Sequence, residues 1–334
     1  MQIKINNKTI GENQPTFIIA EAGINHNGSV KIAKKMIEKA KECGADAIKF
    51  QTFKAEDLAS PKSNFYNTFK KLELDFSDFG ELSDHAKNCG LIFCSTPFSN
   101  EAVDELNKIK VPFFKIAAGD LTHIPLIQHA ASKKKPIIIS TGMADINEIK
   151  YAIKKIESKQ NKKIIVMHSV SSYPTPPKET NLNVIKTMKQ KLKYPIGYSD
   201  NGPDILVPVT AIILGANIIE KHFTLNQKMS GPDQSFSANP KQLSEIVMKA
   251  KEIQEILGDG IKRCMPSEKE NRTNARRSIT ATTNIQKGTK IEANMVGIKR
   301  PAKGIEPHFI NKVVGKVVSK NIKIHESLRW KDLE

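Results

Sequence analysis

The stretch TFIIAEAG, residues 16–23, is a short apolar run rich in β-branched side chains that ends in polar residues. Ser29 follows as a candidate N-cap, and apolar residues then recur at helical spacing over residues 30–40 until Gly44. A continuous apolar run followed by a helix is typical of a parallel strand buried on both faces and its crossover connection. This unit sets the pattern for most of the chain.

The same strand–helix pattern occurs eight times. The apolar runs lie at residues 16–23, 46–51, 92–98, 113–119, 136–142, 164–170, 195–200 and 217–223. Further helices are expected over residues 100–109, 147–156 and 239–257. Eight units in about 260 residues predict an α/β fold, a closed (β/α)8 TIM barrel. A doubly wound open sheet is the alternative, but no GxGxxG follows the first strand and opens a helix.

The composition changes after the predicted barrel, which we place at residues 1–260. Residues 261–277 are highly charged and poor in apolar side chains, which predicts a linker. Residues 278–334 alternate short strand-like pieces with Gly and Pro, and this pattern predicts a small β-rich domain. A domain of this size buries little surface alone and would gain stability by packing on another domain or subunit.

The overall composition excludes several classes of protein. Of the 334 residues, 39% are hydrophobic and 26% charged, as in globular proteins. The apolar runs are too short to span a membrane, and the amino terminus lacks a secretory signal pattern. Four scattered cysteines without a CxxC favour a reducing, cytoplasmic location. The net charge of +17 is spread along the chain, so solvated lysines are favoured over nucleic-acid binding.

Polar residues collect where the predicted strands end, which is where barrel active sites lie. Glu21 ends the first strand and is a candidate general acid or base, although a buried carboxylate bonded to a neighbouring strand is the alternative. Lys49 and Lys115 end two later strands and would repel each other unless an anion lies between them. Hydroxyls at the other strand ends complete a predicted phosphate or carboxylate pocket: Ser95, Thr96, Ser140, Thr141 and Ser199. Schiff-base chemistry at one lysine, or lysines that reach solvent, are alternatives.

A divalent-metal site is a second expectation at the strand ends. His168, Asn201 and His222 end the last three strands, with Asp200, Glu220 and Asp233 nearby. Such mixed nitrogen and oxygen donors suit a divalent ion, although single histidines here would more often be structural. Tyr173 opens a segment with three prolines, YPTPP, that is predicted to be a rigid loop able to wall a sugar pocket.

Eight ordered motifs resemble those of the sialic acid synthase family. They are EAGINHNG (21–28), KFQT (49–52), STPF (95–98), KIAAGD (115–120), STGM (140–143), SYPTP (172–176), GYSD (197–200) and EKHFT (220–224). The carboxyl-terminal domain is similar to the antifreeze-like β-clip (SAF) module of that family. The resemblance covers nearly the whole chain.

This resemblance implies an enzyme that condenses phosphoenolpyruvate with an N-acetylated mannose-type sugar in its open aldehyde form. A divalent ion, usually Mn²⁺ with Mg²⁺ or Co²⁺ as alternatives, would polarise the aldehyde. The methylene carbon of phosphoenolpyruvate would attack it, water would add to the oxocarbenium, and phosphate would leave by C–O cleavage. The resemblance also implies a domain-swapped homodimer, in which each β-clip module covers the partner's barrel, and no nucleic-acid or membrane partner.

The resemblance also implies roles for individual residues. Phosphoenolpyruvate would be held by Lys49, Thr96, Lys115, Ser140 and Ser199. The sugar would contact Gln51, Tyr173, Asp233 and Arg300, the last of these reaching the partner's site. Catalysis would involve Glu21, Lys49, Lys115 and Asp233. The metal ligands would be His222 and Asn201.

Four positions depart from the family pattern. Asn201 stands where a histidine ligand is common, and Ala118 replaces a serine that usually touches the phosphate. Ser171 and Asp120 stand where asparagine and glutamate are often found. The motif EAGINH argues against the pseudaminic branch, and the changed pocket favours a legionaminic acid synthase with 2,4-diacetamido-2,4,6-trideoxy-mannose as acceptor. Alternatives are an N-acetylneuraminate synthase using N-acetylmannosamine, a Schiff-base aldolase of the same fold, and a non-catalytic binding protein that uses the β-clip module.

Overall fold

The computed structural model describes residues 1–334 and divides them into two compact units, Met1–Gly258 and Asp259–Glu334. In the first unit, eight strands close into a barrel in the order β10-β3-β4-β5-β6-β7-β8-β9, and every neighbouring pair is parallel. The strands are β3 (Phe17–Gly23), β4 (Ala47–Thr52), β5 (Ile92–Pro97), β6 (Phe114–Ile116), β7 (Ile137–Ser140), β8 (Ile164–Ser169), β9 (Ile196–Asp200) and β10 (Ile218–His222). Seven lie within the predicted apolar runs and β4 extends one residue beyond its run, so the predicted barrel is confirmed.

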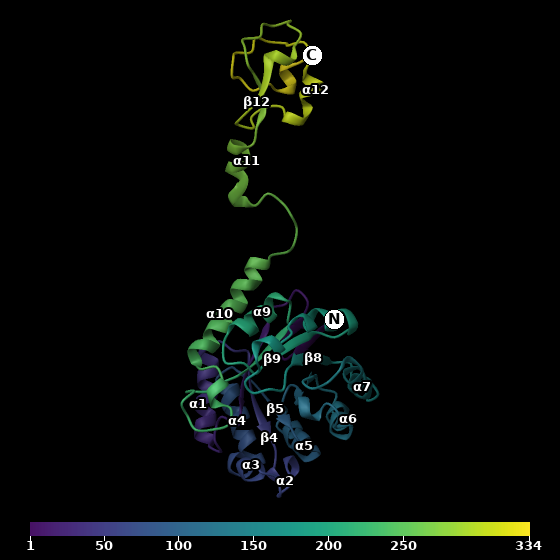
Figure 1. Ribbon diagram of the computed structural model, residues 1–334, viewed down its shortest axis with the longest axis vertical. Coiled ribbons are helices and arrows are strands. Elements are labelled where there is room, and N and C mark those ends of the chain that lie inside the picture. The colour runs from purple at the N-terminus through teal and green to yellow at the C-terminus, as the bar shows by residue number, and fades with distance from the viewer. The chain divides into compact units, whose positions relative to one another are not determined.

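Helices surround the strands (Figure 1). They are α1 (Val30–Glu42), α2 (Ala55–Leu58), α3 (Tyr66–Leu72), α4 (Phe76–Asn88), α5 (Asn100–Lys108), α6 (Ile124–Ser132), α7 (Ile146–Glu157), α8 (Asn183–Lys191), α9 (Leu206–Ile213) and α10 (Pro240–Leu257). Local sequence explains their starts: the Ser29 side chain accepts from the backbone of Ile32, and Asp145 and Glu148 form a capping box at α7. Two of these helices, α2 and α3, were not expected; they lie in the long connection between β4 and β5.

Two apolar layers hold the barrel together. One lies between the strands and the helices and includes Ile37 of α1, Leu82 of α4 and Ile219 of β10. The other fills the barrel interior with side chains such as Ile138, Ile165 and Ile218. Successive side chains of each strand point in turn into the barrel and toward the helices, and this alternation continues to the strand ends. The inward set therefore faces the barrel mouth.

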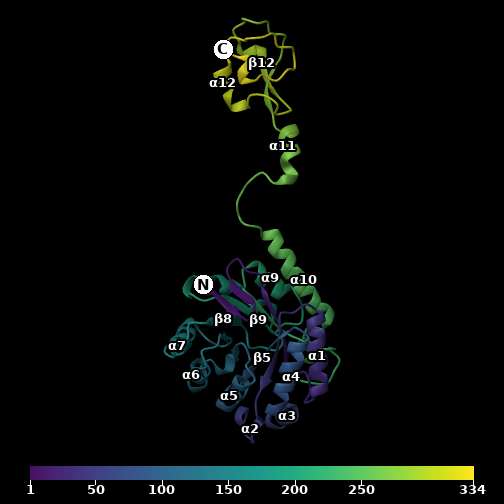
Figure 2. The ribbon, with the colours of Figure 1, turned by 180° about the vertical axis from the view of Figure 1, so that it is seen from behind.

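An amino-terminal hairpin packs on the barrel interior, and the sequence reading did not predict it. Strands β1 (Gln2–Ile5) and β2 (Lys8–Gly11) pair antiparallel. Their buried side chains Ile3, Ile5 and Ile10 join the apolar cluster inside the barrel. Figure 2 shows the amino terminus close to β8 and β9. The hairpin thus extends the interior core at the end of the barrel where β3 begins.

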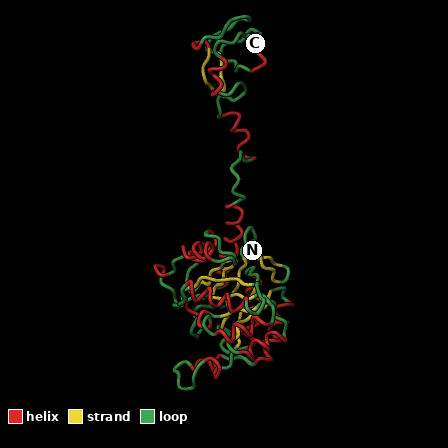
Figure 3. The backbone as a smooth tube through the Cα atoms, turned by 90° about the vertical axis from the view of Figure 1, so that its right-hand side faces the viewer, coloured by secondary structure: helices red, strands yellow, loops and turns green.

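The second unit has its own apolar core, which includes Ile279, Val313, Val318 and Leu328. Strands β11 (Ser278–Ala281) and β12 (Val296–Lys299) pair antiparallel, and isolated bridges and short helices such as α12 (Ile310–Val313) complete it (Figure 3). The predicted linker is partly helical, because α11 (Lys269–Ala275) lies within it. No helix in the chain is both long enough and apolar enough to cross a membrane.

Candidate active site

A cavity of about 460 Å³ opens at the carboxyl end of the barrel strands. It is lined by eleven of the residues that the sequence singled out: Glu21, Lys49, Gln51, Thr96, Lys115, Ser140, Tyr173, Ser199, Asn201, His222 and Asp233. The twelfth candidate residue, Arg300, follows β12 in the second unit. The barrel topology brings the eleven together because the carboxyl ends of its parallel strands all open on the same face.

Two buried lysines occupy the floor of the cavity, and two buried carboxylates neutralise them. Lys49 Nζ lies 2.8 Å from Glu21 Oε2 and 3.7 Å from Glu220 Oε1. Lys115 Nζ lies 3.3 Å from the same Glu220 oxygen. The expected anionic group between the two lysines is, within the protein, the Glu220 carboxylate. Glu220 was left out of the predicted pocket set, although it shares the inward face of β10 with His222.

Hydroxyl and amide groups surround this charged centre. Lys49 donates to Thr96 Oγ1 at 3.0 Å, and Ser199 Oγ donates to Glu220 Oε1 at 3.1 Å. Gln51 Nε2 donates to Glu21 Oε1 at 3.4 Å. The buried Ser140 hydroxyl has no hydrogen-bond partner within the protein. It is therefore an unused donor that faces the cavity, as an anion pocket requires.

The two glutamates have opposite pKa shifts. Burial raises the pKa of Glu21 to about 7, and the attraction of Lys49 only partly offsets this rise. Burial acts in the same direction on Glu220, but Lys115 and Lys49 outweigh it and lower the pKa of Glu220 below its ordinary value. Carboxylates whose pKa values are pushed apart take different roles. Glu21 is suited to exchange a proton near neutral pH, whereas Glu220 stays ionised.

The two lysines also differ. Burial alone would lower the pKa of Lys49, but the Glu21 and Glu220 carboxylates raise it above the ordinary lysine value. Burial lowers the pKa of Lys115, and its single partner Glu220 compensates only in part. Lys49 is therefore a fixed cation, which suits anion binding and opposes a nucleophilic role.

The predicted metal ligands lie on adjacent strand ends. His222 Nδ1 is buried without a hydrogen-bond partner, 3.7 Å from Asp233 Oδ2. Burial and the nearby Lys49 lower the pKa of His222 to about 3, so its ring is neutral. Asn201 Nδ2 donates to Val170 O at 2.7 Å, which leaves its side-chain oxygen as the free end. No group of three or more His, Cys, Asp and Glu residues in the chain could hold a metal ion.

Tyr173 forms one wall of the cavity. Its ring lies edge-on to His222, with the centroids 5.9 Å apart, and 5.6 Å from the Phe236 ring. Asp233 stands nearby, and burial raises its pKa to about 6. The proline-rich loop that carries Tyr173 is held by Thr175, whose hydroxyl donates to Ser172 O at 2.9 Å. A rigid aromatic surface beside a carboxylate is suited to contact a sugar.

An apolar wall faces this polar side, and the sequence reading missed it. It consists of Ile24, Phe65, Phe69 and Phe98. Phe65 is exposed, and its ring lies 6.4 Å from that of Phe69, centroid to centroid. Phe65, the N-cap of α3, and Phe69 within α3 are four residues apart in the sequence. This helical spacing in the connection between β4 and β5 would have predicted that the two rings lie on one face of a helix.

Comparison with known proteins agrees with this geometry. The NeuB family model matches residues 36–262, and the SAF domain model matches residues 276–334. An uncharacterized protein of Methanocaldococcus jannaschii is 46% identical over 99% of this chain and 98% of its own length. The N,N'-diacetyllegionaminic acid synthase of Campylobacter jejuni is 39% identical over 94% of this chain and 99% of its own. The crystal structure of an N-acetylneuraminic acid synthetase from Leptospira borgpetersenii, 37% identical, superposes with a TM-score of 0.78 over 81% of this chain and 95% of that one.

The chain belongs to the NeuB family. The predicted enzyme class, a phosphoenolpyruvate-dependent sugar acid synthase, is thereby confirmed, as is the SAF domain at the carboxyl end. Two of the departures from the family pattern, Ala118 and Ser171, line the cavity of this NeuB protein. Asp120, which stands where the family often has glutamate, does not line the cavity.

Several polar residues near the strand ends have structural roles in this NeuB protein. His168 donates from Nε2 to Thr180 O at 2.8 Å, and Asp200 pairs with Lys221 outside the cavity. Neither lines the cavity, so the wider metal set that included them is wrong. Asn25 donates to Phe223 O and to Ser237 Oγ, both at 2.9 Å. Of the cluster at residues 21–28, only Glu21 and Ile24 line the cavity.

Proposed function

We propose that this protein is a legionaminic acid synthase, which condenses phosphoenolpyruvate with 2,4-diacetamido-2,4,6-trideoxy-mannose. The observation that carries the proposal is a single cavity with two buried lysines on its floor and an apolar wall at its side. The lysines suit the anionic donor, and the apolar wall suits an acceptor with a methyl group at C6.

The donor set of the floor supports phosphoenolpyruvate. Lys115, Ser199 and Lys49 all point to one carboxylate oxygen, Glu220 Oε1. Donors that converge on one oxyanion are also able to hold a phosphate oxygen. Thr96 and the unpartnered Ser140 hydroxyl extend this set. Ala118 has no hydroxyl to donate to the phosphate of phosphoenolpyruvate, so in our proposal the Ser140 hydroxyl donates to it instead.

The proposed reaction forms one carbon–carbon bond and breaks one carbon–oxygen bond. The methylene carbon of phosphoenolpyruvate attacks the aldehyde carbon of the acceptor, and the aldehyde oxygen takes up a proton. Water adds to the resulting oxocarbenium carbon and loses one proton. The C–O bond to phosphate then breaks, the remaining hydroxyl proton passes to phosphate, and a ketone is left at that carbon. Glu21 and Asp233, whose pKa values are raised to about 7 and about 6, are the groups that give and accept these protons.

A divalent ion, which we expect to be Mn²⁺, would polarise the acceptor aldehyde when bound. His222 and Asn201 would hold it. The buried Nδ1 of His222 has no other partner, and the neutral ring is the form that binds metal. The hydrogen bond from Asn201 Nδ2 to Val170 O leaves the amide oxygen as its ligand atom. Carbonyl-type oxygens are among the ligands that suit Mn²⁺.

The acceptor assignment is supported by the apolar wall and by the legionaminic acid synthase relative. Phe65, Phe69 and Phe98 offer an apolar surface to a deoxy carbon, and Thr68 is the polar lining residue beside them in the chain. The alternative, N-acetylneuraminate synthase, is favoured by the 37% identical Leptospira structure, which is described as an N-acetylneuraminic acid synthetase.

Phosphate release from phosphoenolpyruvate tests the proposal directly. With Mn²⁺ present, we expect kcat/KM for the diacetamido-trideoxy sugar to exceed that for N-acetylmannosamine at least tenfold. Equal or reversed preference would contradict the acceptor assignment, and no release with either sugar would contradict the synthase activity. Phe65→Ser should reduce the ratio of kcat/KM between the two sugars. Tyr151→Ser, which removes an exposed aromatic side chain on α7, should leave this ratio unchanged.

We further propose the homodimer that the resemblance implies, with Arg300 serving the partner's cavity. Arg300 belongs to the second unit, which is small and has an apolar core of its own. Arg300→Ala should raise KM for the sugar and leave KM for phosphoenolpyruvate unchanged. Sedimentation equilibrium should give twice the chain mass. A monomer with full activity would contradict this part of the proposal.

A further inference from the structure

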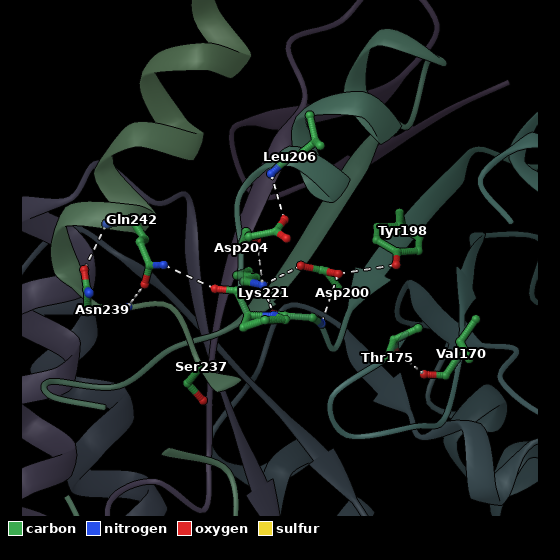
Figure 4. Close-up of polar contacts among 12 residues, drawn as sticks. Val170, Thr175, Tyr198, Asp200, Asp204, Leu206, Lys221, Ser237, Asn239 and Gln242 are labelled. Atoms are coloured by element: carbon green, nitrogen blue, oxygen red, sulfur yellow. Dashed lines mark hydrogen bonds and ion pairs between the residues drawn. The ribbon is translucent and has the colours of Figure 1, made fainter. Parts of the chain in front are cut away.

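A third buried lysine, Lys221, lies next to the proposed metal ligand His222 on β10. Lys221 is completely buried, and its Nζ lies 2.5 Å from Asp200 Oδ2 (Figure 4). Glu220 and His222, its chain neighbours, line the cavity, whereas Lys221 does not. Alternation along the strand therefore turns Lys221 outward, behind the wall of the cavity. The proposed reaction makes no use of it.

Lys221 holds an irregular loop between β9 and α9. Its ammonium donates to Gly202 O and, at 3.2 Å, to Asp204 O. Between these two carbonyls, Pro203 O accepts from Gln242 of α10 at 3.2 Å. The backbone carbonyls of Gly202, Pro203 and Asp204 thus all accept hydrogen bonds from Lys221 or Gln242. Figure 4 shows the bonds of these two side chains. The loop begins directly after Asn201.

Asp200 is fixed as firmly as its partner. Its Oδ1 accepts from the Tyr198 hydroxyl at 3.3 Å and from the Gly202 backbone at 3.2 Å. Asp200 and Lys221 are also paired in register on the neighbouring strands β9 and β10. Each of them directly precedes a proposed metal ligand in the sequence: Asp200 precedes Asn201, and Lys221 precedes His222.

We propose that Lys221 is a positioning residue, which through Asp200 and the loop carbonyls holds Asn201 and His222 at the spacing that a divalent ion needs. This inference rests on the proposed function and on its metal site. The ion pair joins the two strands on their outer face, and the two ligands stand on the inner face one residue further along each strand. A sliding of β9 relative to β10 would therefore separate Asp200 from Lys221 and, at the same time, Asn201 from His222.

A role in stability alone explains the pair poorly. Removing an ammonium and a carboxylate from water costs several kcal/mol per ion, and a well-packed apolar pair is often as stable. In some proteins a buried ion pair fixes one geometry, and we propose this role for Lys221 and Asp200. Asn201 is also held from its other side, because Val170 O accepts from its side chain and its own carbonyl accepts from Thr175 N at 3.2 Å. The amide is therefore fixed on both sides.

Binding of Mn²⁺ to the full chain, followed by electron paramagnetic resonance of the free ion, tests the proposal. Lys221→Met should raise the dissociation constant for Mn²⁺ by about 10- to 100-fold, the range for residues that orient ligands. The affinity for phosphoenolpyruvate, measured without metal, should stay within about twofold. Lys135→Met is the matched control: this lysine, just before β7, has no hydrogen-bond partner and lies outside the cavity.

A second variant guards against simple unfolding. Lys221→Met leaves Asp200 as an unpaired buried charge, whereas the double variant Asp200→Asn with Lys221→Met leaves none. The double variant should fold and still bind Mn²⁺ weakly. Wild-type Mn²⁺ affinity in either folded variant would overturn the proposal, as would unfolding of both or equal loss of Mn²⁺ and phosphoenolpyruvate. If the wild type binds no Mn²⁺ the inference also fails, and phosphate release then decides the synthase proposal separately.

Discussion

Glu21 and Glu220 show how two residues of one type acquire different properties in one cavity. Both are buried, and both contact Lys49. Glu220 has a second cation, Lys115, and a donor hydroxyl from Ser199, whereas Glu21 has only Lys49 and the amide of Gln51. The difference in compensation explains why the pKa of Glu21 is raised and that of Glu220 is lowered.

The Glu21 assignment leads to a kinetic prediction. Glu21→Gln keeps the shape and the hydrogen bond from Gln51 but removes the exchangeable proton. We expect kcat for phosphate release to fall by about 10²- to 10⁴-fold, the usual contribution of a general acid or base. The dissociation constant for phosphoenolpyruvate, measured by calorimetry, should change much less. A variant with near wild-type kcat would show that Glu21 moves no proton in the slow step.

His26 makes the stability of the protein depend on pH. It is buried and accepts the Gly28 N–H at Nδ1, and burial lowers the pKa of its ring to about 4. Because the folded pKa lies below the unfolded value of 6.5, stability is complete above pH 6.5 and is lost as the pH falls toward 4. Between pH 7.5 and pH 5 this one residue should cost about 2 kcal/mol.

Urea unfolding at the two pH values measures this effect. His26→Gln should lose less stability than the wild type on going from pH 7.5 to pH 5. An unchanged response in His26→Gln would contradict the prediction.

At the scale of elements, helix starts were well predicted because their signals are local. Ser29 and Asn239 were at or next to the expected boundaries, and both side chains cap the helices that follow. The hairpin of β1 and β2 was missed, because its short strands are stabilised by contact with the barrel interior and not by a strong turn signal. The same holds for α2 and α3, each of seven residues or fewer, which depend on tertiary packing.

The capping box of α7 is a local device whose contribution can be measured. The Asp145 side chain accepts from the backbone of Asn147 at 2.7 Å and of Glu148 at 2.9 Å. Asp145→Ala should lower the free energy of unfolding by about 1 kcal/mol and leave kcat unchanged, since the cap lies outside the cavity. Lys150→Ala on the exposed face of α7 should change stability far less. Equal effects of the two would argue against the cap.

At the scale of the whole molecule, the chain consists of two units with separate apolar cores. Residues 265–277, which open the second unit, are all exposed and include Arg272 and Arg276. Trypsin at low concentration should therefore cut first in residues 259–277 and release two resistant fragments, identifiable by mass spectrometry. First cuts within the barrel would contradict this division. Replacing Arg272 and Arg276 with Gln should slow the early cut.

The sequence by itself determined the barrel, because eight apolar runs separated by helical segments allow few other arrangements. It also determined which residues stand at the strand ends, and nine of these line one cavity together with the loop residues Tyr173 and Asp233. Only the tertiary structure decided which strand-end residues face inward and what each one contacts. Glu220 and Lys221 are neighbours in the chain, yet one neutralises the lysines of the cavity and the other binds Asp200 behind it. The reason is that alternation, register and burial set pairings and pKa values across strands that are distant in sequence.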